Sequence, residues 1–231
     1  MKIRQGYVSN SSSSSFLIIY NDKDEFFKFK LFEGYDTFIK DLNNENKKEF
    51  YINCIANMIY GYLYNWTKFD NNDSNDNGND LWSLCKIANI NDCLGNIMLE
   101  TIDKIKNKFW KDIKKESEET YNLCHNILQN TTDGVNNIVY MFDENIRSVW
   151  RKYYEKYNKE TYEFIYSDKN KKRVNKAAKN IYDAIIKNGK QIKFIRYEDD
   201  TDKGDYMEHC FMPFIANNPE RKYEIFIKSE H

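Results

Sequence analysis

The chain has little proline, glycine or histidine: 231 residues include two Pro, eight Gly and three His. It also has almost no net charge, because 35 Lys and Arg residues are balanced by 36 Asp and Glu residues. A near-neutral chain has no global field that would draw it onto phosphate backbones, so any contact with nucleic acid must be local. Three histidines also restrict acid–base catalytic schemes severely.

Long apolar runs and paired cysteines are missing as well. No stretch approaches the ~20 apolar residues of a membrane span, and serines replace the apolar segment that a signal peptide needs after the charged residues 1–4. The five cysteines are scattered and contain no Cys-x-x-Cys pair, which is typical of buried thiols in a reducing compartment. We therefore expect a cytoplasmic protein without membrane contact.

Aromatic residues are abundant, with 18 Tyr and 15 Phe, and they indicate aromatic-rich packing. A chain of this length can bury one substantial core, so the sequence predicts a single domain over 1–231. Apolar alternation predicts a β-hairpin at 16–32 and a β-meander at 190–228. The region between them, 36–188, is mainly helical in pattern. The predicted fold class is α+β, with one antiparallel sheet formed by the hairpin and the meander, and the helical middle packed on it.

Three-and-four spacing of apolar residues marks the individual helices. Helices are predicted at 47–66, 91–115, 118–128, 144–157 and 171–188, the last ended by Gly189. The segment 135–142 fits either a strand or a buried helix, and 162–166 is strand-like. Residues 69–80 are polar and lack apolar anchors, which predicts a surface loop that is dispensable for folding.

A serine run directly before the first apolar strand is the first candidate binding segment. It consists of Ser11, Ser12, Ser13, Ser14 and Ser15. Consecutive backbone N–H groups and hydroxyls are the elements of an anion-binding nest. No Gly-rich loop or Lys-Ser/Thr ending accompanies them, so the run is not a phosphate loop. The alternative is a polar connection whose hydroxyls satisfy local backbone groups.

An acidic turn near the C-terminus gathers the candidate metal ligands Asp200, Asp202, Glu208 and His209. Carboxylates with an imidazole suit Mg²⁺ or Mn²⁺ in a hydrolase. The spacing also resembles the opening of a calcium loop, but the later bidentate Glu is missing. The alternative, which we favour, is a solvated turn without a cofactor. A zinc site would require the fold to unite Cys124 and His125 with His209 and Cys210.

Two helical stretches are rich in basic residues and are candidates for phosphate contacts. The first has Trp110 among Lys104, Lys106, Lys108, Lys111, Lys114 and Lys115; the second has Lys169, Lys171, Lys172, Arg173, Lys176 and Lys179. Solvated helix faces have the same composition. We therefore predict that a partner surface is aromatic with a basic rim, because interface energy resides in a few aromatic and Arg anchors.

Residues 2–16 form a basic-Gly-aromatic-Val-Ser-Asn-polySer-Phe segment. This segment resembles the start of a group of largely uncharacterised phage, prophage and bacterial proteins. Members often carry a second segment, an aromatic residue leading into an acidic turn with Gly and then Glu-His, and 197–209 looks similar, although Cys210 stands where Gly often follows. The resemblance implies a phage or mobile-element origin, hence a host bacterial cytoplasm, and supplies no catalytic residue.

These observations favour a phage-type accessory protein that binds a macromolecular partner, such as host machinery or a defence system. The partner we expect is a protein, with nucleic acid as an option through the basic helices. The alternative is a metal-dependent hydrolase or nuclease that uses the acidic turn and His209, so whether the chain is an enzyme stays open.

Overall fold

The structure is a computed structural model that describes residues 13–21, 43–69, 81, 84–86, 88–90, 96–130, 134–198 and 223–230. The chain divides into two compact units. Met1–Cys54 and Asp183–His231 form one unit, and Ile55–Tyr182 forms the other. Compactness does not show whether the units fold independently, so the single domain over 1–231 stays a prediction.

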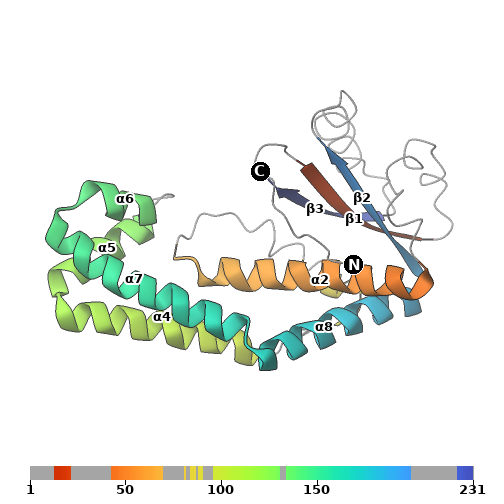
Figure 1. Cartoon of the computed structure of the whole chain (residues 1–231), viewed down its shortest axis with the longest axis horizontal. Coiled ribbons are helices and arrows are strands. Elements are labelled where there is room, and N and C mark those ends of the chain that lie inside the picture. The colour runs from red at the N-terminus through yellow and green to blue at the C-terminus, as the bar shows by residue number, and fades with distance from the viewer. Residues whose placement is uncertain are drawn as a thin grey trace. The chain divides into compact units, whose positions relative to one another are not determined.

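The first unit contains a three-stranded antiparallel sheet (Figure 1). Its strands are β1 (Ser13–Asn21), β2 (Lys190–Glu198) and β3 (Tyr223–Glu230), in the order β2-β1-β3. Phe16 of the central strand is in register with Ile195 on one side and with Ile227 on the other. The Ile19 side chain on β1 is buried, as expected for an apolar residue on a central strand. The predicted strands at 26–32 and 206–215 lie outside the described residues.

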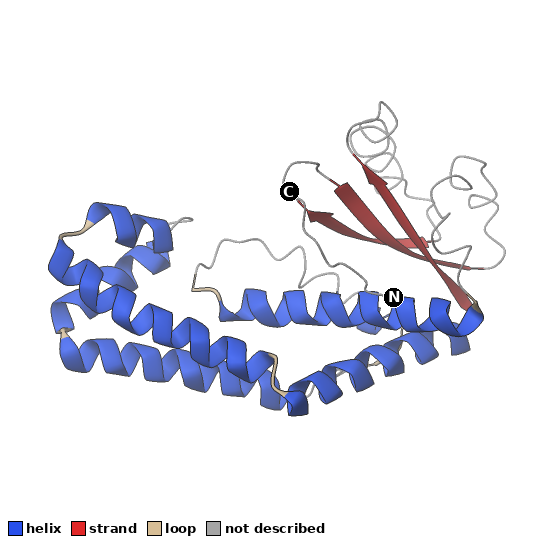
Figure 2. Cartoon of the chain, in the orientation of Figure 1, coloured by secondary structure: helices blue, strands red, loops and turns tan. Residues whose placement is uncertain are grey.

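Helices make up most of the described chain (Figure 2). They are α2 (Asn44–Thr67), α4 (Asn96–Glu116), α5 (Glu118–Asn130), α6 (Gly134–Met141), α7 (Glu144–Ile165) and α8 (Asp168–Lys187). The α+β prediction is therefore wrong, because the part of the chain that the structure describes is mainly helical. The physical reason is that α4–α7 bury their apolar faces against one another, so among the described residues this core is built from helices without a strand.

Periodicity located most helices well. Those predicted at 47–66, 118–128 and 171–188 are confirmed as α2, α5 and α8, and the 91–115 helix is described from Asn96 as α4. The ambiguous segment 135–142 is helical, as α6. The strand-like reading of 162–166 is wrong, because α7 continues through Ile165. Gly189 ends α8 with a φ of 73°, the left-handed conformation that glycine adopts at little cost.

Polar side chains cap several helix starts. The Asp143 carboxylate accepts hydrogen bonds from the backbone N–H groups of Asn145 and Ile146, at 2.9 and 3.1 Å. At the start of α5, Ser117 Oγ accepts from the N–H of Thr120 at 3.1 Å. Such bonds satisfy donors that have no partner inside the helix. They explain why α5 and α7 begin where they do.

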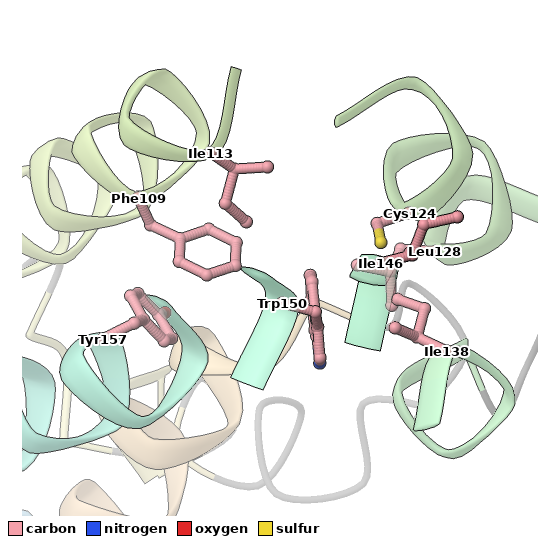
Figure 3. Close-up of a cluster of buried hydrophobic side chains, with 8 residues drawn as sticks. All are labelled: Phe109, Ile113, Cys124, Leu128, Ile138, Ile146, Trp150 and Tyr157. Atoms are coloured by element: carbon pink, nitrogen blue, oxygen red, sulfur yellow. The ribbon is translucent and has the colours of Figure 1, made fainter. Parts of the chain in front are cut away.

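The core of the second unit lies between α4, α5, α6 and α7 (Figure 3). Its buried side chains are Phe109, Ile113, Cys124, Leu128, Ile138, Ile146, Trp150 and Tyr157. Trp150 is 1% exposed, and its ring centroid lies 5.3 Å from that of Phe109 in an edge-to-face arrangement. Edge-to-face pairs are a preferred geometry of aromatic rings. Part of the aromatic abundance of the sequence is thus found in this core and in the residues packed against it.

Three interhelical ion pairs run along α4 and α7. Lys108 contacts Glu160 at 2.5 Å, Asp112 contacts Lys156 at 3.5 Å, and Glu116 contacts Lys152 at 2.6 Å. The partners step by four residues in opposite directions, as the antiparallel packing of the two helices requires. Exposed pairs of this kind contribute little to stability, because solvent screens their charges. Their main consequence is that, in this alignment of α4 and α7, each of these charged residues lies opposite a residue of the other sign.

The C-terminal end of α2 is held by side chains of α4 and α7. The Tyr157 hydroxyl donates to the Thr67 carbonyl at 2.6 Å, and Lys106 Nζ donates to the Lys68 carbonyl at 2.8 Å. Carbonyls of the last helical turn have no partner inside the helix and need such donors. Burial lowers the pKa of Lys106. These two bonds fix the point where α2 ends.

Phe69 follows this helix end and corrects the loop prediction. Its ring centroid lies 4.7 Å from that of Tyr157 and 4.8 Å from that of Phe109. The first residue of the predicted loop is therefore an apolar anchor, contrary to the expectation for 69–80. Residues 70–80 lie outside the described residues.

Candidate interaction surface

The predicted serine site is only partly described. Ser13, Ser14 and Ser15 are the first residues of β1, in register with both β2 and β3, whereas Ser11 and Ser12 lie outside the described residues. Backbone groups of a central strand pair with neighbouring strands on both sides. Anion binding by this run stays a prediction, and at Ser13–Ser15 it would have to use the hydroxyls rather than the backbone.

The predicted metal ligands Asp200, Asp202, Glu208 and His209 all lie outside the described residues. Within the described ranges, no three His, Cys, Asp or Glu side chains form a group that would hold a metal ion. Of the zinc alternative, only Cys124 and His125 are described. Burial raises the pKa of Cys124 to about 12, and His125 packs against the ring of Trp110. A zinc ligand must be a thiolate, so Cys124 is better explained as a core residue.

We expect the protein to lose stability at alkaline pH, beginning near pH 9. The Cys124 thiol keeps its proton in the folded state up to about pH 12, because burial raises its pKa, while the unfolded chain releases it near the ordinary value of 9.0. Between these values the folded state binds more protons, so stability falls with rising pH by up to about 1.4 kcal/mol per pH unit. Burial also raises the pKa of Tyr157, which extends the loss above pH 10.

Urea unfolding at stepped pH values tests this expectation. Cys124→Ala should shift stability by a constant amount at neutral pH and should flatten the decline that begins near pH 9. An unchanged decline in the variant would show that Cys124 is not its source.

Three of the six lysines of α4 have partners inside the second unit. Lys108 pairs with Glu160, Lys114 contacts Glu118 at 3.7 Å, and Lys106 donates to a backbone carbonyl. Trp110, the predicted stacking residue of this stretch, instead packs in edge-to-face contact with Tyr121. These contacts reduce the number of α4 lysines available to a nucleic acid, although Lys104, Lys111 and Lys115 are exposed. The sequence did not reveal this, because the ion-pair partner of Lys108 lies on another helix.

A pocket between α4 and α7 is too small for a substrate. Its volume of about 10 Å³ corresponds to roughly one water molecule. It is lined by Lys108, Phe109, Asp112, Tyr153, Lys156, Tyr157 and Glu160, most of which belong to the ion pairs between the two helices. This pocket therefore supplies no catalytic site.

Four tyrosines on α2 and at the C-terminal end of α7 define what we call the tyrosine surface: Tyr60, Tyr64, Tyr162 and Tyr166, the last being the C-cap residue of α7. The Tyr60 and Tyr166 rings stack at 5.1 Å with an interplanar angle of 22°, and Tyr162 lies 4.6 Å from Tyr166. Tyr64 follows Tyr60 by one helical turn on α2, which places both on the same helix face.

Two members of the tyrosine surface are strongly exposed. Tyr64 is 58% and Tyr162 is 65% exposed, whereas Tyr60 and Tyr166 are partly buried. Burial and the nearby Tyr166 raise the pKa of Tyr60. Lys68 Nζ lies 6.0 Å from the centroid of Tyr64 and places a cation beside the rings. The surface thus combines the stacked pair Tyr60 and Tyr166, two exposed tyrosine rings and a nearby lysine.

Sequence reasoning missed this surface, although a local signal existed. Tyr60 and Tyr64, and likewise Tyr162 and Tyr166, are four residues apart, the spacing that puts side chains on one helix face. Reading 162–166 as a strand hid the second pair. The stacking of Tyr60 on Tyr166 joins residues 106 positions apart in the chain, so no local pattern indicated it.

Comparison with protein-family models, curated protein sequences and solved structures finds no match in any of the three. Among the described helices, none is both long enough and apolar enough to cross a bilayer.

Proposed function

We propose that this protein is a cytoplasmic accessory protein of a phage or mobile element, and that it acts by binding a protein partner through the tyrosine surface. The observation that carries the proposal is the exposure of Tyr64 and Tyr162, each one helical turn from a member of the stacked pair Tyr60 and Tyr166. The phage origin rests separately on the resemblance of residues 2–16.

The geometry of the tyrosine surface suits a protein interface. Tyrosine supplies a large rigid contact area with few rotatable bonds, and its hydroxyl forms hydrogen bonds at the rim. Tyr and Trp are enriched among the residues that dominate binding energy. Here the contact of Tyr162 with Tyr166 restricts the Tyr162 side chain, which reduces the conformational entropy that this residue loses on binding.

A capture experiment with matched variants tests this proposal. In lysate of the bacterial host, the wild-type chain is expected to capture a protein partner. The double variant Tyr64→Ser/Tyr162→Ser should bind this partner about thirtyfold less tightly, which corresponds to a loss of about 2 kcal/mol of binding free energy. The Phe variants of the same residues should retain most binding, because the rings remain. The control is Tyr140→Ser, since Tyr140 lies on α6 and is 81% exposed.

Two outcomes contradict the proposal. Equal loss in the Tyr140 control would show a general effect of removing exposed tyrosines. A thousandfold fall in affinity between 50 and 200 mM salt would indicate many phosphate contacts rather than an aromatic protein interface. We expect a fall of less than about tenfold for a protein partner of this near-neutral chain.

A further inference from the structure

A second surface with different chemistry lies on α8. This helix has seven basic residues and only two acidic ones, whereas the whole chain has a formal charge of −1. The basic residues are Lys169, Lys171, Lys172, Arg173, Lys176, Lys179 and Lys187. The second unit ends at Tyr182, and all of these residues except Lys187 belong to it.

The lysines of α8 follow one face of the helix. Lys169, Lys172 and Lys176 are exposed and recur at three- and four-residue spacing, with Lys171 beside them. The opposite face is buried through Val174, Ala178 and Ile181, each 0% exposed. At a rise of 1.5 Å per residue, the stripe from Lys169 to Lys176 extends about 10 Å. The packing of the apolar face therefore holds a linear series of cations toward solvent.

These cations are not neutralised within the part of the chain that the structure describes. No ion pair joins Lys169, Lys171, Lys172 or Lys176 to a described carboxylate, whereas Lys108 and Lys114 on α4 pair with Glu160 and Glu118. This difference in ion pairing matters because the α4 and α8 stretches are both rich in lysine and look alike in the sequence. The α8 stretch leaves the larger share of its charge available to an external anion.

The composition of the α8 face distinguishes between two classes of partner. From Lys169 to Asn180, every exposed residue is Lys or Asn. A protein interface is enriched in aromatic and Arg anchors and depleted of Lys, and this face exposes no aromatic residue. Lys and Asn are instead common donors to phosphate oxygens. The face therefore matches a phosphate backbone better than a protein.

We propose that the exposed face of α8 binds the phosphate backbone of a nucleic acid. The proposal is independent of the tyrosine surface, because it rests on other residues and another chemistry. Neutrality of the whole chain does not oppose it, since backbone contacts act over about 10 Å or less at 0.1 M salt. Lysine contacts to phosphates are insensitive to sequence, so we expect binding without strong sequence preference.

Fluorescence anisotropy with two labelled probes tests the proposal on the full chain. The probes are an oligothymidine of about 20 nucleotides and a duplex of about 20 base pairs. Comparing them shows whether the face prefers single-stranded or double-stranded nucleic acid. Four phosphate contacts on the single strand predict a fall in affinity of about fiftyfold between 50 and 200 mM salt.

Matched triple variants locate the site. Lys169→Gln/Lys172→Gln/Lys176→Gln is expected to weaken probe binding by about tenfold or more at 50 mM salt. The control, Lys104→Gln/Lys111→Gln/Lys115→Gln, removes three exposed lysines of α4 and the same charge, and it should retain binding. Arginine at the three α8 positions keeps the charge and should also retain binding. Tyr64→Ser/Tyr162→Ser should leave probe binding unchanged, so failure of either proposal is seen separately.

Several results would overturn the proposal. The first is failure of the wild-type chain to bind either probe at 50 mM salt. The second is an equal loss of probe affinity in the two glutamine variants. The third is a dependence of affinity on salt weaker than a single phosphate contact would give. Displacement of the probes by polyglutamate at equal charge concentration would assign the face to an acidic protein. If circular dichroism showed that the α8 glutamine variant is unfolded, two measurements would still test the proposal. These are probe binding by the arginine variant and the salt dependence of probe affinity for the wild-type chain.

Discussion

Replacing Trp150 by alanine is expected to lower the free energy of unfolding by about 3–5 kcal/mol, the range for a fully buried large aromatic side chain. The side chain is 1% exposed and sits in the core of the second unit (Figure 3). Its ring stacks on Tyr154 at 5.2 Å and meets Phe109 edge-to-face. Removing it deletes contacts to several helices at once and leaves a cavity that the surrounding helices cannot fill.

A phenylalanine variant separates the packing of Trp150 from its polar group. The indole Nε1 is buried and has no hydrogen-bond partner among the described residues, so its presence is expected to cost stability. Trp150→Phe keeps an aromatic ring and removes the unsatisfied donor. We therefore expect less than half of the loss caused by alanine. Urea unfolding followed by circular dichroism is the appropriate measurement, since the substitution removes a fluorophore.

Two results would contradict this expectation for Trp150. A loss below about 1 kcal/mol for Trp150→Ala would mean that the core can collapse around the missing ring. A larger loss for phenylalanine than for alanine would show that Nε1 is satisfied in solution.

Phe69→Ala is expected to cost about 2–4 kcal/mol, somewhat less than a fully buried phenylalanine. Phe69 is partly buried, yet its ring centroid lies 4.7 Å from that of Tyr157 and 4.8 Å from that of Phe109. It also follows the end of α2, where Tyr157 and Lys106 hold the last carbonyls. The substitution would therefore weaken both the aromatic core and the attachment of the chain that leaves α2.

Shortening the polar segment after Phe69 is the matched control. Removing residues within 71–79 while retaining Phe69 should change the melting temperature by less than about 5 °C, roughly the effect of 1 kcal/mol. The thermal melt of Phe69→Ala should fall clearly below that of the shortened chain. The reverse order would place the anchor within 71–79 instead of at Phe69.

Local patterns explain which features were predictable. The helices α2, α5 and α8 were located because an amphipathic stripe repeats within the helix itself, and Gly189 marked an end through its own backbone freedom. The last turn of α7 was misread because 162–166, rich in aromatic and β-branched residues, also suits a strand. Its continuation in α7 shows tertiary packing overriding propensity.

The sequence by itself determined the periodicity of the helices, the near-neutral charge and the aromatic abundance, because each is a property of residues or of their near neighbours. Only the tertiary structure decided the predominance of helices among the described residues, the packing of Phe69 on Phe109 and the stacking of Tyr60 on Tyr166. It also decided that Lys108 is paired with Glu160 while Lys169 on α8 is not paired with a described carboxylate. The physical reason is that pairing and burial depend on which faces meet in space, and similar lysine-rich stretches do not specify that locally.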